Sequence, residues 1–317
     1  MLVNLILLLI GLYVLIKSAD ILVDGAGSLA KKWGMSGLLI GLTVISFGTS
    51  LPEVLVNVLA SFRGSYDIGM GNIVGSNISN TLLVLGITVL VAGVLKVDKS
   101  IINKLIPFSI LSVIVLFVLA NGTLINGSGE PGLFRSGGVI LLCFFSIFIY
   151  FTFTEKSKEE EESVRERNLF ASWLMTIGGL LGLYFGAKLT VDNAEIIARI
   201  MGVSEALIGI TVIGLGTSLP ELAACLAAAL KKQAGMAIGN IVGSNIFNIL
   251  WVLGVSSIIK PIEYSPILDI DIGIVIISSI ILIPLIIFGK KNYLTRSGGI
   301  VMVILYIAYI IYVVIRG

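Results

Sequence analysis

The chain has 317 residues, of which 57% are hydrophobic and only 13% are charged. A soluble domain carries roughly 25% charged residues, so this composition, with a mean hydropathy of +1.08, excludes a soluble protein and indicates an integral membrane protein. The net charge of +2 gives no indication of a nucleic-acid partner, and the absence of histidine excludes histidine-based zinc sites and histidine proton relays.

A membrane-spanning helix requires about 20 predominantly apolar residues. The first such run has no basic segment ahead of it, so it is predicted to be a membrane span rather than a signal peptide. In all, the sequence predicts an all-α integral membrane protein with ten transmembrane helices, near residues 2–30, 36–62, 68–95, 102–120, 133–154, 169–199, 204–230, 236–259, 267–288 and 296–315. The first and sixth spans are long because an apolar start continues into an amphipathic stretch. The charged residues of these stretches fit an access path or a helix end better than an ion ligand; they are Asp20, Asp24, Lys188 and Asp192.

A charged segment, residues 155–168, divides the spans into a first half (1–154) and a second half (169–317). Lysine and arginine gather in the connections on the side of this segment, so the positive-inside rule predicts a cytoplasmic linker and both termini outside. The protein is expected in the plasma membrane. Because each half has five spans, the second half enters the membrane in the opposite sense. Such inverted repeats are typical of alternating-access secondary transporters.

One stretch of the sequence occurs twice. Residues 41–53 (GLTVISFGTSLPE) recur as residues 209–221 (GITVIGLGTSLPE), and residues 71–80 (GNIVGSNISN) recur as residues 239–248 (GNIVGSNIFN), with the same spacing at every matched position. The chain is therefore predicted to be two copies of one unit. Each copy places a carboxylate, hydroxyls and amides within apolar segments, and ionisable residues at membrane depth are costly enough to mark a functional site that faces the protein interior.

The first motif predicts a broken helix. Pro52 has no N–H to donate, so the helix is expected to break and release the carbonyl groups of Gly48 and Thr49, which membrane proteins tolerate only where they line a cavity. Helical spacing places the polar residues on one face: Ser46, Thr49, Ser50 and Glu53 in the first copy, and Gly214, Thr217, Ser218 and Glu221 in the second. Inverted symmetry is expected to bring Glu53 and Glu221 face to face near the midplane.

The second motif predicts a companion helix with two faces. A stripe of small residues allows close helix packing; it contains Gly71, Gly75 and Ser79, and again Gly239 and Gly243. A neighbouring polar stripe contains Asn72, Ser76 and Asn80, and again Asn240, Ser244 and Asn248. Asn72 and Asn240 fit either ion binding or helix–helix hydrogen bonding, whereas Asn77 and Asn245 turn away from the polar stripe and favour hydrogen bonding between helices.

The ligands that this cavity would offer are all oxygen atoms: two carboxylates, amides, hydroxyls and free carbonyl groups. Ca²⁺ takes six to eight oxygen ligands in flexible geometry, whereas soft transition metals prefer thiolate or imidazole. Two glutamates balance one divalent ion or two monovalent ions, which favours exchange of the one for the other. The alternative for Glu53 and Glu221 is a structural pair at two helix ends, although two carboxylates at one depth destabilise each other unless an ion binds.

These duplicated motifs resemble the two α-repeats of the cation/Ca²⁺ exchanger superfamily, and most of all those of prokaryotic sodium/calcium exchangers. The resemblance covers nearly the whole chain. It implies a ten-helix fold with a four-helix core that holds the ion sites, and two long helices, here the first and sixth, that slide across the core. It also implies that the transported ions are Ca²⁺ and Na⁺, with no resident cofactor and no obligatory protein partner.

Matched position by position, the resemblance implies that Glu53 and Glu221 bind both ions, and that the carbonyl groups of Thr49 and Thr217 complete the Ca²⁺ site. Two further groups would bind Na⁺: Ser46, Ser50 and Ser76 at one corner, and Gly214, Ser218 and Ser244 at the other. Asn80 and Asn248 would occupy the central corners. Some exchangers that resemble this chain have aspartate where Asn248 stands, which leaves the stoichiometry and the choice between Na⁺ and H⁺ open.

The sequence thus predicts an antiporter that exports Ca²⁺ in exchange for Na⁺. Two alternatives remain open, a Ca²⁺/H⁺ antiporter of the same fold and a passive cation channel, while an enzyme is not expected because no catalytic motif is present. Asn121 and Asn126 each begin a glycosylation sequon in a loop predicted to be extracellular, although turn chemistry explains them equally well. Cys143 and Cys225 lie in apolar runs and are predicted to be small buried hydrophobic residues.

Overall fold

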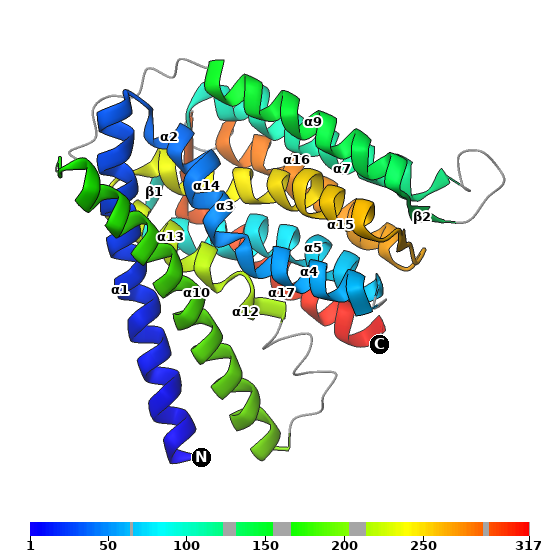
Figure 1. The fold of residues 1–317 in the computed structure, drawn as a ribbon, viewed down its shortest axis with the longest axis horizontal. Coiled ribbons are helices and arrows are strands. Elements are labelled where there is room, and N and C mark those ends of the chain that lie inside the picture. Colours follow the sequence, from blue (N-terminus) through cyan, green and yellow to red (C-terminus); the bar gives the residue numbers. More distant parts are fainter. Residues whose placement is uncertain (64–65, 123–130, 155–165, 203–213, 288–291, 317) are drawn as a thin grey trace.

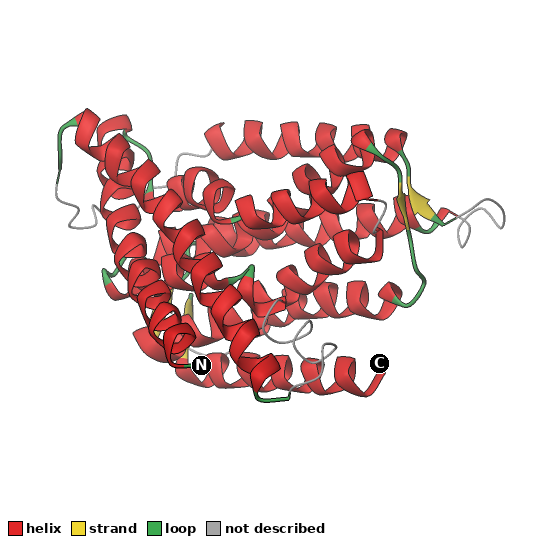
Figure 2. Cartoon of the chain, turned by 60° about the horizontal axis from the view of Figure 1, so that its bottom comes forward, coloured by secondary structure: helices red, strands yellow, loops and turns green. Residues whose placement is uncertain are grey.

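The computed structural model describes residues 1–63, 66–122, 131–154, 166–202, 214–287 and 292–316. The described residues form helices and two short β-ribbons, as Figure 2 shows. In the first half the elements are α1 (Leu2–Trp33), α2 (Gly37–Ile40), η1 (Gly41–Ile45), α3 (Ser46–Thr49), α4 (Leu51–Arg63), α5 (Tyr66–Ile78), η2 (Ser79–Val84), α6 (Leu85–Ala92), β1 (Val94–Lys96), η3 (Ile101–Leu105), α7 (Ile106–Ala120), β2 (Gly132–Leu133) and α9 (Arg135–Thr154). In the second half they are α10 (Leu169–Ile200), α12 (Gly214–Gly216), α13 (Leu219–Leu230), α14 (Ala234–Phe247), η5 (Asn248–Val252), α15 (Leu253–Ile259), β3 (Ile262–Glu263), α16 (Leu268–Ile287), β4 (Tyr293–Thr295) and α17 (Arg296–Arg316).

Eight helices of the described chain are long and apolar enough to cross a membrane, and the bent pair Gly37–Thr49 and Leu51–Leu59 makes a ninth. They confirm the predicted multi-pass, all-helical class and match nine of the ten predicted spans. The remaining span was predicted at residues 204–230. Its first part, to residue 213, lies outside the described residues, and its last part is the short apolar helix α13.

The two longest helices, α1 and α10, pack against each other in antiparallel directions (Figure 1). They approach so closely that a Cβ atom built on Gly179 would lie 2.8 Å from the Cα atom of Leu22, whereas one on Gly178 would meet nothing within 4 Å among the described residues. Gly34, in the left-handed conformation, ends α1, and the side chain of Asn168 accepts a hydrogen bond from Ala171 N–H at the start of α10. The long helix pair also packs against the shorter helices, α1 mainly on α13.

The span after α1 is broken where the sequence predicts it. Helix α3 ends at Thr49 and α4 begins at Leu51, with a bend of 41° between them. Pro52 stands at the second position of α4, where a missing N–H costs nothing. The second copy repeats this arrangement, because α12 ends at Gly216 and α13 begins at Leu219, with Pro220 in its first turn.

π-helical turns occur at equivalent places in the two companion helices. The turn η2 follows α5 and the turn η5 follows α14, so Asn80 and Asn248, which are counterparts in the two copies, both lie in π-helical backbone. A π-helical turn is rare and frequently occurs at a functional site. The sequence pattern does not reveal these turns, since each is an irregularity within a continuous apolar helix.

Each β-ribbon joins a strand from the first half to a strand from the second half. β1 pairs with β4 in antiparallel register, and β2 pairs with β3 in the same way. β1 and β2 lie at opposite ends of the bundle (Figure 1). The sequence does not predict these strands, because two or three residues are too few to show an alternating pattern.

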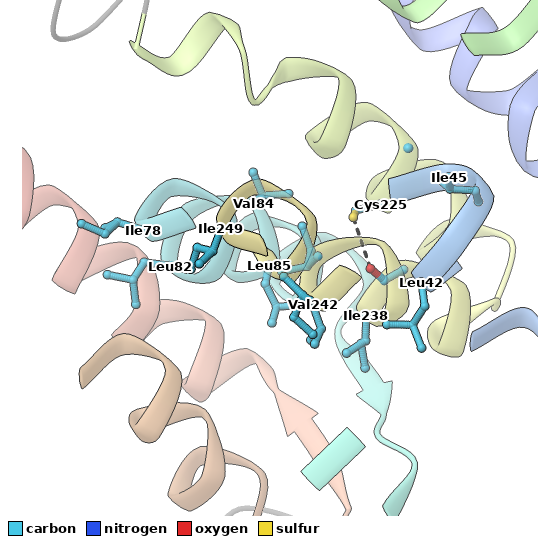
Figure 3. Packing of buried hydrophobic residues seen from close by; sticks show 14 of the residues in the cluster. Leu42, Ile45, Ile78, Leu82, Val84, Leu85, Cys225, Ile238, Val242 and Ile249 are labelled. Atoms are coloured by element: carbon cyan, nitrogen blue, oxygen red, sulfur yellow. Dashed lines mark hydrogen bonds between the residues drawn. The ribbon is translucent and has the colours of Figure 1, made fainter. Parts of the chain in front are cut away.

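The companion helices form the core of the bundle. In the spans Gly69–Ala92 and Ala234–Ile259, 78% and 83% of the most apolar window is buried, compared with 39% or less in the other six long helices, whose apolar side chains form the outer surface. Figure 3 shows Leu42 from η1 beside Ile238 and Val242 from α14. Cys225 is buried there as predicted, and its thiol donates to the carbonyl of Ala237. The prediction for Cys143 was wrong: it is exposed on α9, because that helix lies at the edge of the bundle.

A polar cluster lies where α7 ends near the start of α16. Asn121 is buried and its amide donates to Asp269 over 2.9 Å, and the Tyr264 hydroxyl donates to the same carboxylate. Burial, followed by this hydrogen bond, raises the pKa of Tyr264, so the hydroxyl remains a donor at neutral pH. The amide of Asn121 therefore joins the end of α7 to the first turn of α16. Asn126 lies outside the described residues.

Candidate ion-binding site

The two repeated glutamates lie in the first turns of two helices that follow a break. Glu53 is in the first turn of α4 and Glu221 is in the first turn of α13, and both side chains are fully buried. The N-terminus of a helix carries unpaired N–H groups and a partial positive charge, which stabilise a nearby anion. The helix break therefore creates a place where a carboxylate is tolerated deep inside an apolar bundle.

Hydroxyl contacts link the two copies with twofold symmetry. The Oγ atoms of Thr49 and Ser244 lie 3.4 Å apart, and those of Ser76 and Thr217 lie 3.3 Å apart. In the sequence repeat, Thr217 is the counterpart of Thr49 and Ser244 is the counterpart of Ser76. The broken helix of each copy thus meets the companion helix of the other, and the equivalent side chains meet in both places.

A further contact joins a serine of the first copy to the glutamate of the second. The Ser50 hydroxyl donates to Glu221 Oε1 over 3.5 Å, a long and therefore weak hydrogen bond. Its counterpart Ser218 is buried, and its hydroxyl has no hydrogen-bond partner among the described residues. Side chains from both halves therefore surround the carboxylates.

The asparagines divide into two groups. Asn77 donates to the backbone carbonyl of Asn245 over 3.1 Å, and Asn245 donates to the Thr81 hydroxyl over 2.8 Å, so they connect the companion helices as predicted. Asn248 donates to Asn77 but keeps its own carbonyl oxygen unpaired, and Asn80 has neither amide atom paired within the described chain. The two amides in π-helical backbone thus retain unused oxygen atoms.

Asn240 has the hydrogen-bonding role that was one of its two predicted alternatives. Its Oδ1 accepts from the Thr49 hydroxyl over 3.1 Å, while its Nδ2 donates to the Cys225 sulfur over 3.3 Å. In the first copy, the amide nitrogen of Asn72 has no partner among the described residues. The side chain of Asn240 therefore fixes the position of Thr49 between α3 and α14.

Ser46 and Gly214 occupy equivalent positions in the two copies. The Ser46 hydroxyl donates to the Leu42 carbonyl over 2.7 Å, which leaves its oxygen lone pairs available. A Cβ atom built on Gly243 would lie 2.7 Å from this hydroxyl oxygen and 2.8 Å from the Leu42 carbonyl, so the small-residue stripe of α14 brings η1 and α3 close. Gly214 begins α12, and the residues before it lie outside the described chain. The equivalent stripe at Gly71 and Gly75 faces nothing within 4 Å among the described residues.

The site is rich in buried oxygen atoms that accept no hydrogen bond from the described residues. They are both carboxylate oxygens of Glu53, Oε2 of Glu221, Oδ1 of Asn80, Oδ1 of Asn248 and Oγ of Ser218. Buried polar groups are nearly always paired, and exceptions require an explanation. Two carboxylates with neutral oxygen atoms around them suit a hard cation, and the described residues contain no cluster of three or more His, Cys, Asp or Glu that would suit another metal.

Asn57 is a buried polar residue near the proposed site that the sequence did not indicate. It is buried one turn beyond Glu53, and its amide donates to the Glu53 carbonyl over 2.9 Å, while its Oδ1 has no partner within the described residues. Its counterpart in the second copy is Cys225. The four-residue spacing places Asn57 on the same helix face as Glu53, which could have identified it. The repeat did not identify it, because the two copies carry different residues at this position.

The charged residues of the long helices form ion pairs away from the glutamates. The Lys231 ammonium lies 2.6 Å from Asp24 and also donates to the backbone carbonyl of Asp20 over 2.8 Å. Lys188 pairs with Asp192 over 2.8 Å within α10. These pairs agree with the expectation that the four residues do not themselves bind the ion.

A family model described as "Sodium/calcium exchanger protein" matches residues 3–154 and 171–315. The chain is 40% identical over 265 residues to the putative antiporter CaxA of Alkalimonas amylolytica, covering 82% of each chain. It is also 29% identical over 344 residues to the sodium/calcium exchanger MaX1 of Methanosarcina acetivorans, covering 98% of each.

Among solved structures, the sodium-calcium exchanger NCX_Mj, soaked with zero Na⁺ and Ca²⁺, superposes with a TM-score of 0.83 at 33% identity. The match covers 98% of this chain and 99% of that one. Other structures of the same protein, soaked with Na⁺, Ca²⁺ or Sr²⁺, match at TM-scores of 0.81 to 0.82. The similarity therefore extends over the whole fold, the long helix pair and the broken helices included.

Proposed function

Since this chain belongs to the sodium/calcium exchanger family, we propose that it exports Ca²⁺ from the cell in exchange for Na⁺ by alternating access. The family membership supports a cation/Ca²⁺ antiporter, and the proposal adds the driving ion and the direction. The observation that carries it is the pair of fully buried glutamates, Glu53 and Glu221, among unpaired neutral oxygen atoms.

Two glutamates can balance one Ca²⁺ or two Na⁺, so the same carboxylates serve both ions in turn. The proposed ligands are the side chains of Glu53, Glu221, Ser46, Ser50, Ser76, Ser218, Ser244, Asn80 and Asn248, the backbone carbonyls of Thr49 and Thr217, and the backbone at Gly214. The closeness of Ser76 to Thr217 and of Thr49 to Ser244 supports this set, because it gathers residues from both halves around one centre. The many neutral oxygen ligands favour Na⁺ over H⁺, since a proton needs only the carboxylates.

The architecture proposed for this function is two inverted five-helix repeats, residues 1–154 and 169–317, joined by a cytoplasmic linker at 155–168. The antiparallel packing of α1 on α10, the ribbons at opposite ends and the twofold hydroxyl contacts support it. We further propose that both termini lie outside the plasma membrane, and that α1 and α10 move across the core to alternate access.

The test is uptake of radioactive Ca²⁺ into proteoliposomes with pH clamped and a single driver, either internal Na⁺ or an imposed proton gradient. Uptake driven by internal Na⁺ without a pH gradient is the expected result. Uptake driven only by the proton gradient would replace Na⁺ with H⁺ and leave the site intact, and Ca²⁺ flux without counterflow would indicate a channel.

The matched variant is Glu53→Gln, which keeps the shape of the side chain but removes one of the two charges. It is expected to abolish uptake, while the protein remains folded by size-exclusion chromatography. If uptake persists at the wild-type rate, Glu53 is not an ion ligand.

A further inference from the structure

A cavity of about 310 Å³ lies between three segments of the first half, α2–η1, η3–α7 and α9, and outside the ion site. Its walls are formed by aliphatic and aromatic side chains, among them Leu38, Leu42, Phe108 and Phe148. The rings of Phe108 and Phe148 stack with centroids 5.8 Å apart, which gives the cavity a flat wall. In volume and lining it resembles pockets that take apolar ligands.

The cavity lies at one end of the bundle. Ser36 immediately precedes α2, Ser100 immediately precedes η3, and Thr152 is in the last turn of α9, and all three line the cavity. Helices α7 and α9 run beside each other along one edge of the bundle (Figure 1). Because spans begin and end at this level, the cavity opens where lipid head groups meet acyl chains.

The rim is polar and carries a positive charge. Lys104 is exposed and lines the opening, and the buried Ser100 hydroxyl has no hydrogen-bond partner among the described residues. Basic pockets between transmembrane helices bind anionic lipid head groups, and hydrogen bonds from lysine to phosphate are among the strong ones. The apolar walls therefore suit an acyl chain, and the rim suits a phosphate.

We propose that this pocket binds an anionic phospholipid, with one acyl chain between α2, α7 and α9 and its phosphate at Lys104 and Ser100. Apolar cavities of this kind stay dry and take apolar ligands, and at a membrane boundary the available ligand is lipid. The charge of Lys104 distinguishes an anionic lipid from a zwitterionic one. This binding does not depend on which ions the protein transports.

The bound chain would touch residues that support the ion site. The Leu42 carbonyl accepts the hydrogen bond of Ser46, and the Leu38 carbonyl packs against Gly239 of α14. Lipid in the pocket therefore holds η1 in place beneath the proposed ligands. This consequence for transport rests on the proposed function, whereas the binding itself is tested separately.

The binding test places a fluorescent reporter in the pocket. Phe151→Trp is made in a protein whose three native tryptophans are changed to Phe, and the protein is reconstituted in phosphatidylcholine with a small fraction of lipid brominated on its acyl chains. Brominated phosphatidylglycerol is expected to quench the reporter several-fold more than brominated phosphatidylcholine. A reporter at Phe153→Trp, exposed on the same helix but not lining the pocket, is expected to be quenched equally by both.

Lys104→Gln is expected to abolish the preference for phosphatidylglycerol, and Lys99→Gln, a nearby exposed lysine that does not line the pocket, is expected to retain it. Equal quenching by the two lipids at position 151, or a preference that survives Lys104→Gln, would overturn the proposal. If the tryptophan-free protein does not fold, native mass spectrometry of the otherwise unchanged chain replaces it. Retention of one phosphatidylglycerol that Lys104→Gln loses supports the site, and retention that is unaltered rejects it.

Discussion

At the scale of single residues, Asn248 is the least expected member of the proposed ion site. Its Oδ1 is buried and unpaired among the described residues, while its Nδ2 donates to Asn77. The amide supplies an oxygen atom without a charge, so the two glutamates carry the whole negative charge of the proposed ligand set. The charge at this position should therefore control how tightly the exchanged cations are held.

We expect Asn248→Asp to raise the apparent affinity for Na⁺ or Ca²⁺ about tenfold, which corresponds to about 1.4 kcal/mol, because a third carboxylate adds Coulomb attraction in a site of low dielectric. The affinity is read from the ion dependence of exchange in proteoliposomes. Asn80→Asp is the matched variant, since Asn80 is the repeat counterpart and should give a change of the same sign. If the ion affinities are unchanged in both variants, Asn80 and Asn248 are not ion ligands.

At the scale of elements, the fit between α1 and α10 depends on glycine. A Cβ atom at Gly179 would meet backbone atoms of Leu22, and backbone cannot rotate away as a side chain can. The neighbouring Gly178 has open space. The two glycines therefore separate the effect of helix packing from the effect of helix propensity.

Gly179→Ala is expected to force α1 away from α10 and to lower the thermal midpoint of the detergent-solubilised protein by several degrees. Gly178→Ala should leave it unchanged or raise it slightly, because alanine favours a helix over glycine by up to about 1 kcal/mol. The measurement is the thermal unfolding midpoint of both variants, determined in parallel. Equal unfolding midpoints for the two variants would mean that the close contact at Gly179 does not contribute to stability.

A second contact between elements is the ion pair of Lys231, at the end of α13, with Asp24 of α1. Both side chains are partly exposed, so its energy is small, but it joins a long helix to the core. Lys231→Gln is expected to lower the population of the conformation in which α1 is paired with α13. Because Cys225 is buried in that conformation, a thiol reagent should then label it faster. Cys143 is changed to Ser so that Cys225 is the thiol that is labelled. Lys232 is exposed and adjacent to Lys231, so Lys232→Gln is the control and should leave the labelling rate unchanged.

At the scale of the whole molecule, the proposed topology makes a simple prediction. Both termini should lie outside the cell and the linker at 155–168 inside, because lysine and arginine gather on the linker side. Alkaline phosphatase fused after Gly317 should be active, and the same enzyme fused within the linker should be inactive. Green fluorescent protein at the two positions should give the opposite result, and the reverse pattern would invert the topology.

The sequence was sufficient for the all-helical membrane class and for nine of the ten predicted spans, because apolar length and a motif repeated at constant spacing are visible in the sequence itself. The broken helix at Pro52, the buried glutamates and the helix-connecting role of Asn77 all agree with expectation. What it did not reveal depends on packing: the π-helical turns at Asn80 and Asn248 leave no compositional trace, and the exposure of Cys143 depends on which helices lie at the edge. The ribbons were missed because strand pairing between distant segments is not a local property.

The twofold contacts have a consequence for the resting state of the proposed exchanger. If the halves were identical in sequence, the inward-open and outward-open conformations would be the same structure with the halves interchanged, and their populations would be equal. Any bias that originates in the protein itself then arises from unequal counterparts, such as Asn57 and Cys225. A free-energy difference of about 1.4 kcal/mol between the two conformations would set their populations tenfold apart, so the resting conformation of the empty protein depends on the positions at which its two copies have diverged.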